Sequence, residues 1–147
     1  MDGQLNRLNS AGTGLKKTIT TDETRETRLF DAPDWRKEFI PLLDIPFNQS
    51  AWDNAFTCDS AINAQETRLI YHPTEVGIPL RELSVRISAH DTSITARLER
   101  NNLWFTLHKT LQYSSKNGYS FTVEQHTLLG SSEKTVIEGR FNHTSAR

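Results

Sequence analysis

The chain has 147 residues, and its 17 Lys and Arg residues are balanced by 18 Asp and Glu residues, which gives a formal net charge of −1. This balance excludes the strongly positive surface of a dedicated duplex-DNA binder. The length suits one core, and no stretch approaches the roughly 18 consecutive apolar residues of a membrane helix. Because the N-terminus also lacks a signal-peptide pattern, we expect a soluble cytoplasmic protein with no membrane partner.

Residues 1–28 have the composition of a flexible tail. They contain no aromatic residue, and their few Leu and Ile side chains follow no sustained helical or alternating period. Such a segment buries too little apolar surface to offset the entropy lost on ordering. We therefore predict a tail over residues 1–28 that is mobile in the isolated protein or orders on a partner, followed by a single α+β domain over residues 29–147.

Two short helices are predicted at the start of this domain. Asp31 can cap the first helix, which tolerates Pro33 in its opening turn and carries Trp35, Phe39 and Leu42 or Leu43 at helical spacing. Ser50 and Asp53 resemble a capping box for a second helix, whose apolar side would comprise Trp52, Ala55, Phe56 and Ile62. This helix would also contain the only cysteine, Cys58, which rules out an internal disulfide and is expected to be a buried structural thiol.

The remainder alternates between apolar and polar residues, as a strand with one buried face does. The pattern begins with a short strand over residues 67–72, and it is clearest from Leu83 to Ala89. It predicts a five- to six-stranded antiparallel meander whose apolar face is covered by the two helices, which is an α+β two-layer fold.

Turn residues predict the register of this meander, because opposed residues in an antiparallel pair share a face. A two-residue turn at Asn101 and Asn102 would set Leu98 opposite Phe105 and Ala96 opposite Leu107. A loop over residues 116–118, with Gly118 in the left-handed region, would set Tyr113 opposite Phe121 and Leu111 opposite Val123. The same matching puts Ile87 opposite Ala96 and Val123 opposite Phe141, and it leaves the last strand, residues 135–141, at an open edge.

The polar face of the predicted sheet brings together one group with the chemistry of a metal site. In the predicted register His108, His126 and Glu138 lie in one row, with Glu124 and His90 nearby. Two imidazoles and a carboxylate at cross-strand spacing could bind a divalent metal or transfer protons. The alternative is that these residues simply face water, and we expect no cofactor.

The same face carries a candidate interaction surface, formed by Trp104 and Leu128 with Arg97 and Arg86 beside them. A large exposed aromatic side chain often marks a contact surface. Arginines next to a tryptophan also suit a platform for single-stranded nucleic acid, although the interspersed glutamates oppose that interpretation.

Three functions fit these patterns. The first is a non-enzymatic protein-interaction or assembly module that binds itself or another protein, as small viral or phage structural and accessory proteins do. The alternative is a small cone-shaped α+β enzyme or ligand-binding protein with a pocket between helices and sheet. The third is the single-stranded nucleic-acid platform. We expect the first, with self-association through the sheet surface or an open edge.

Overall fold

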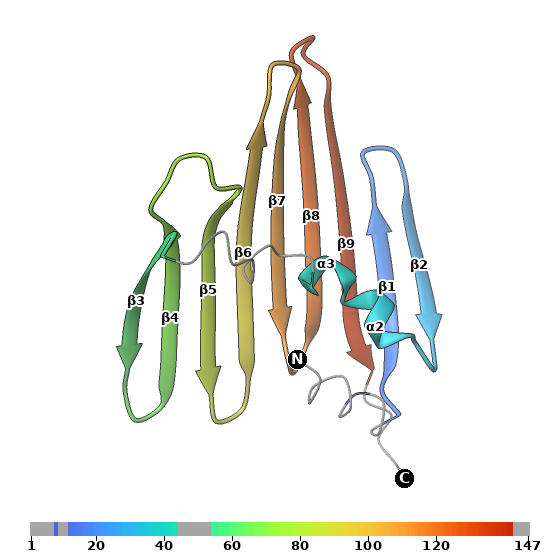
Figure 1. The fold of residues 1–147 in the computed structure, drawn as a ribbon. Coiled ribbons are helices and arrows are strands. Elements are labelled where there is room, and N and C mark those ends of the chain that lie inside the picture. Colours follow the sequence, from blue (N-terminus) through green and yellow to red (C-terminus); the bar gives the residue numbers. More distant parts are fainter. Residues whose placement is uncertain (1–7, 9–11, 44–53, 143–147) are drawn as a thin grey trace.

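The computed structural model describes residues 8, 12–43 and 54–142, and its main feature is one antiparallel sheet of nine strands (Figure 1). The strands are β1 (Gly14–Thr20), β2 (Arg25–Phe30), β3 (Phe56–Ile62), β4 (Glu66–Pro73), β5 (Leu80–Ser88), β6 (Thr92–Asn101), β7 (Phe105–Ser114), β8 (Gly118–Thr127) and β9 (Ser132–Asn142). Their order across the sheet is β2-β1-β9-β8-β7-β6-β5-β4-β3. Strands that are consecutive in sequence are therefore neighbours in the sheet, except β2 and β3, which lie at its two edges, and β1 pairs with β9.

The predicted fold of two helices on a five- to six-stranded meander, preceded by a flexible tail, is wrong. Apart from the single helical residue Leu8, the described helical structure is one short segment made of two turns, α2 (Trp35–Glu38) and α3 (Ile40–Leu43). The prediction of consecutive antiparallel strands is confirmed from β4 to β9, but three further strands extend the sheet at its two sides. No helix among the described residues is long and apolar enough to cross a membrane.

Residues 14–30, most of which were predicted to be a tail, form β1 and β2. The backbone of β1 pairs with β9 from Gly14 opposite Asn142 to Thr20 opposite Val136. The alternation in β1 is hard to recognise because Lys17 takes an inward position between Leu15 and Ile19. Pairing with a strand more than 100 residues away supplies the stabilisation that the local sequence lacks.

The second predicted helix is also wrong in its described part. Residues 56–62 form β3, and Cys58 is exposed on that strand rather than buried in a helix. Ser50, Trp52 and Asp53 lie outside the described residues. The apolar residues of this segment fit a helical period and a strand equally well, and pairing with β4 decides the outcome.

The helical segment covers one face of the sheet over β8, β9 and β1 (Figure 1). As the spacing predicts, Trp35 and Phe39 are buried, at 2% and 1% exposure, although Asp34 caps the helix rather than Asp31. The ring of Phe39 packs edge-on against Tyr113 at 5.6 Å between centroids, and Trp35 packs against Phe141 at 5.4 Å. The other buried apolar residues of this core are Leu8, Leu15, Ile78, Leu80, Leu83, Ala96 and Leu111.

A polar contact fixes the helix to the sheet. One carboxylate oxygen of Glu38 accepts hydrogen bonds from Lys17 Nζ at 2.8 Å and from the Tyr119 hydroxyl at 2.6 Å. Lys17 and Tyr119 flank Gly139 in the register, and any side chain at Gly139 would overlap the Tyr119 ring. Burial, together with the hydrogen bond to Glu38, raises the pKa of the Tyr119 hydroxyl far above its usual value.

The predicted registers are wrong, but each differs from the observed pairing by an even number of residues. Ala96 pairs with Leu111 and Leu83, rather than with Leu107 and Ile87. The other observed pairs that replace predicted ones are Leu98 with Lys109, Ile87 with Thr92, Tyr113 with Tyr119, Leu111 with Phe121 and Val123 with Thr135. Because side chains alternate with a period of two, an even shift leaves each residue on its predicted face.

The sheet edges also differ from prediction. The last strand, β9, is paired on both sides, and the edge strands are β2 and β3. Within β2, Arg25, Glu26 and Arg28 are charged, whereas Asp59 is the only charged residue of β3. Charged side chains discourage edge-to-edge pairing, so β3 is the less protected edge.

Candidate interaction surface

Four large apolar side chains gather in two adjacent hairpin loops at one end of the sheet. Their exposed fractions are 84% for Leu103, 73% for Trp104, 75% for Leu128 and 97% for Leu129. Leu103 and Trp104 belong to the β6–β7 loop, and Leu128 and Leu129 belong to the β8–β9 loop. Figure 1 shows these loops at the upper end, where β6 to β9 project beyond the neighbouring strands. We call these four residues the apolar tip.

Hydrogen bonds hold the backbone of the apolar tip. The Asn102 side-chain oxygen accepts from the backbone N–H groups of Trp104 at 2.8 Å and Phe105 at 2.9 Å. The two loops are joined directly, because the Leu128 N–H donates to the Trp104 carbonyl at 2.9 Å. The side chains are therefore presented by a defined backbone, so little backbone order needs to be gained on binding.

Neither loop carries a charged side chain: residues 102–104 are Asn, Leu and Trp, and residues 128–131 are Leu, Leu, Gly and Ser. Desolvating a charge is the main cost of covering a polar surface, and it does not arise here. A shallow hollow lies beside the tip, and its lining includes Thr106 and His126. The tip therefore combines exposed apolar area with loops that carry no charged side chain.

The predicted surface residues Trp104 and Leu128 thus lie side by side, in loops rather than on the sheet face. The two-residue turn predicted at Asn101 and Asn102 would place Leu103 in a strand, so the predicted surface includes neither Leu103 nor Leu129. A signal was present in the sequence: Leu103-Trp104 and Leu128-Leu129 are apolar doublets that break the alternation of the strands. Two adjacent apolar residues cannot both face the core of a one-sided sheet.

Arg86 and Arg97 do not join this surface. Arg86 Nε contacts Glu66 at 2.6 Å, and Arg97 contacts Glu82 at 3.0 Å, so each guanidinium has a carboxylate partner. Nor do the two arginines oppose one another, since Arg86 pairs with Ser93 and Arg97 with Thr110 and Glu82.

The structure brings together only part of the predicted metal row. The His108 and His126 rings are neighbours, with centroids 6.2 Å apart, whereas Glu138 lies between Ser120 and Thr18 on other strands. Glu124 is opposite His108, but its carboxylate contacts Lys134 at 2.6 Å. This hydrogen bond and the Lys134 charge hold the pKa of Glu124 below its usual value. Among the described residues no group of three or more His, Cys, Asp or Glu side chains is arranged to hold a metal ion.

None of the protein-family models, curated proteins or solved structures compared with this chain matches it.

Proposed function

We propose that this protein is a non-enzymatic interaction module that self-associates through the apolar tip. The observation that carries the proposal is the pairing of two rigid, uncharged loops that together expose four large apolar side chains. Single exposed apolar residues are common on protein surfaces, whereas four large ones in two hydrogen-bonded loops suit a contact surface.

A second copy is the simplest partner for such a surface. Two tips related by a twofold axis present identical apolar groups, which is how isologous dimers form. Each tip offers roughly 450 Å² of apolar surface, given about 150–250 Å² for a tryptophan and ~100 Å² for each leucine. Two tips would bury about 900 Å², which is in the range of weak, transient interfaces. We therefore expect association in the micromolar range or weaker.

Light scattering across micromolar to submillimolar concentrations tests the proposal. The wild type should show a mass that rises with concentration, and Trp104→Glu should restore the monomer mass, because a charge cannot be buried in the contact without a partner. Val76→Glu is the matched control, since Val76 is 87% exposed in another loop. It should leave association unchanged.

Two results would contradict self-association through the apolar tip. A mass that stays monomeric at every concentration contradicts self-association and leaves a different protein as the partner of the tip. If Trp104→Glu leaves a larger species unchanged, the contact is elsewhere. The edge strand β3, with its single charged residue Asp59, would then be the next surface to substitute.

A further inference from the structure

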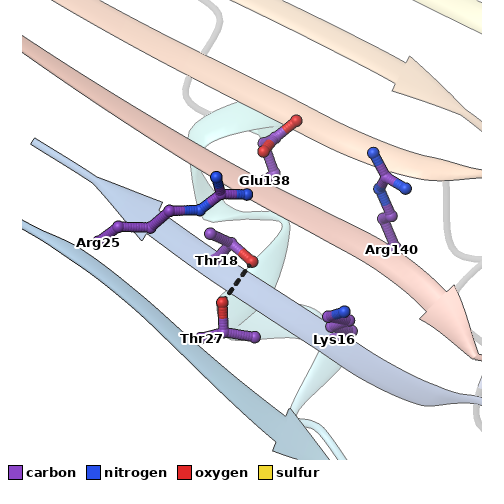
Figure 2. Close-up of a pocket in the computed structure, with 6 residues that line it drawn as sticks. All are labelled: Lys16, Thr18, Arg25, Thr27, Glu138 and Arg140. Carbon is purple, nitrogen blue, oxygen red and sulfur yellow. Dashed lines mark hydrogen bonds between the residues drawn. The ribbon is translucent and has the colours of Figure 1, made fainter.

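A second feature lies on the face of the sheet opposite the helical segment, where β2, β1 and β9 meet. Figure 2 shows a small hollow there, with the helical segment behind the sheet. Its volume is about 150 Å³, and it is lined by Lys16, Thr18, Arg25, Thr27, Glu138 and Arg140. Three of these six residues are cations and one is a carboxylate.

The pairing of the strands places like charges side by side in the hollow. Lys16 and Arg140 are directly opposed across β1 and β9, with their Cβ atoms about 5 Å apart. Like charges at this spacing repel one another. Within the described residues, Lys16, Arg25 and Arg140 form no ion pair. Other cations on the same face do form ion pairs: Arg97 with Glu82, and Lys134 with Glu124.

The centre of the hollow supplies hydrogen bonds. Thr18 is 7% exposed, and its hydroxyl is 3.0 Å from the hydroxyl of Thr27, with which it is paired across β1 and β2. Only one of the two hydroxyl hydrogens is used in that contact, so the other can be donated to a ligand. Arg25 extends from β2 across this pair towards Glu138 (Figure 2).

We propose that this hollow binds a phosphoryl group, as found in a small phosphate monoester. Three cations and one carboxylate leave a net charge of +2, which balances the charge of a phosphate dianion at neutral pH. Arginine and lysine side chains with a hydroxyl donor are the groups that bind phosphate oxygens. Glu138 repels a second anionic group but accepts a hydrogen bond from a hydroxyl, so it favours a ligand that carries hydroxyl groups next to its phosphate.

A discrete anion fits better than a nucleic-acid strand. A strand needs a track of cations along the surface. Farther along this face, Arg86 and Arg97 are each paired with a glutamate. Arg68 lies opposite Arg86 on β4, and β5 to β8 separate it from the hollow, so no continuous track of unpaired cations leads away from the hollow. This inference is independent of the apolar tip, which lies at the upper end of the sheet in Figure 1, whereas Lys16 lies near the start of β1.

The test is a titration of the isotopically labelled protein with inorganic phosphate at constant ionic strength, followed by backbone amide NMR. We expect saturable shifts centred on Thr18, Thr27 and Glu138, with a dissociation constant on the order of 1 mM. Arg140→Gln should weaken binding about tenfold. Glu138→Gln should strengthen binding several-fold, because it removes the only negative charge. Arg97→Gln, the matched control on the same face, should have no effect.

Lys16→Gln provides a second readout that loss of structure cannot imitate. It should raise the melting temperature in phosphate-free buffer, because it relieves repulsion with Arg140, and it should reduce the rise that phosphate produces. Two further titrations distinguish the source of the group: glycerol 3-phosphate, and phosphatidylcholine vesicles with and without phosphatidic acid. Binding to either one, with the same sensitivity to Arg140→Gln, supports phosphoryl recognition and identifies its source.

The proposal is overturned if phosphate causes no saturable shifts in the hollow, or if Glu138→Gln weakens binding. Binding of a single-stranded oligonucleotide in the absence of any phosphate binding would also overturn it, because a polymer track would then be the site.

Discussion

Replacing Gly118 tests the register between β8 and β9. Gly118 has φ +128°, a backbone conformation that residues with side chains rarely adopt. A Cβ at this position would also collide with the backbone carbonyl of Gly139 on β9. The Gly139 carbonyl belongs to a strand paired on both sides, so it cannot move away without breaking ladder contacts.

Replacing Gly118 should lower the free energy of unfolding for two reasons. Strained backbone costs about 1–3 kcal/mol, and overpacking costs about 1–3 kcal/mol. Gly118→Ala should therefore lower the free energy of unfolding by about 3 kcal/mol or more, which corresponds to a fall in melting temperature of roughly 6–12 °C for a chain of this size.

Substitutions at two other glycines separate the cost of backbone strain from the cost of overpacking. Gly130 has φ +85° but open space around its Cβ position, so Gly130→Ala should cost only about 1 kcal/mol. Gly77 has open space and no positive φ, so Gly77→Ala should be nearly neutral or slightly stabilising. Urea unfolding of the three variants, with unchanged slopes, gives the differences directly. If Gly118→Ala costs no more than Gly130→Ala, then the Gly139 carbonyl is not where the register places it.

Three further predictions concern ionisable groups. Because the pKa of Tyr119 is raised in the folded state, the stability that this group contributes should be complete below pH about 10 and should be lost as the pH rises above it. Tyr119→Phe should remove that alkaline loss in chemical unfolding measured against pH. Burial opposes ionisation of Asp91, but hydrogen bonds from Ser115, Ser114 and the Lys116 N–H outweigh it and hold the pKa of Asp91 below its usual value. The contribution of Asp91 to the free energy of unfolding should be present above pH about 4 and lost as the pH falls. Asp91→Asn should lower the free energy of unfolding by about 1–2 kcal/mol at neutral pH, and the stability of this variant should fall less in acid. Zinc should not raise the melting temperature, because Lys134 occupies the carboxylate of Glu124 beside the two histidines; a rise abolished by His108→Ala would contradict this.

The sequence alone predicts which side chains share a face of the sheet. The period-two alternation in β5 to β9 sorts Leu83, Ala96 and Leu111 from their polar neighbours, and this sorting survives every error in register, because each error is an even number of residues. The spacing of Trp35 and Phe39 likewise predicts their burial against the sheet. These signals are local, since they depend only on the backbone geometry of a strand or a helical turn.

Tertiary contacts determine which strands form at the two sides of the sheet and how all the strands align. β1 is held in the sheet by β9 and by the contact of Lys17 with Glu38, and neither can be recognised from the residues around Lys17. The same long-range pairing brings Lys16 opposite Arg140 and so creates the hollow between β2, β1 and β9. The apolar tip depends on the alignment of two hairpins, through which the Leu128 N–H reaches the Trp104 carbonyl. Contacts between residues far apart in the chain leave no periodic pattern in the sequence, so both sites come from the fold.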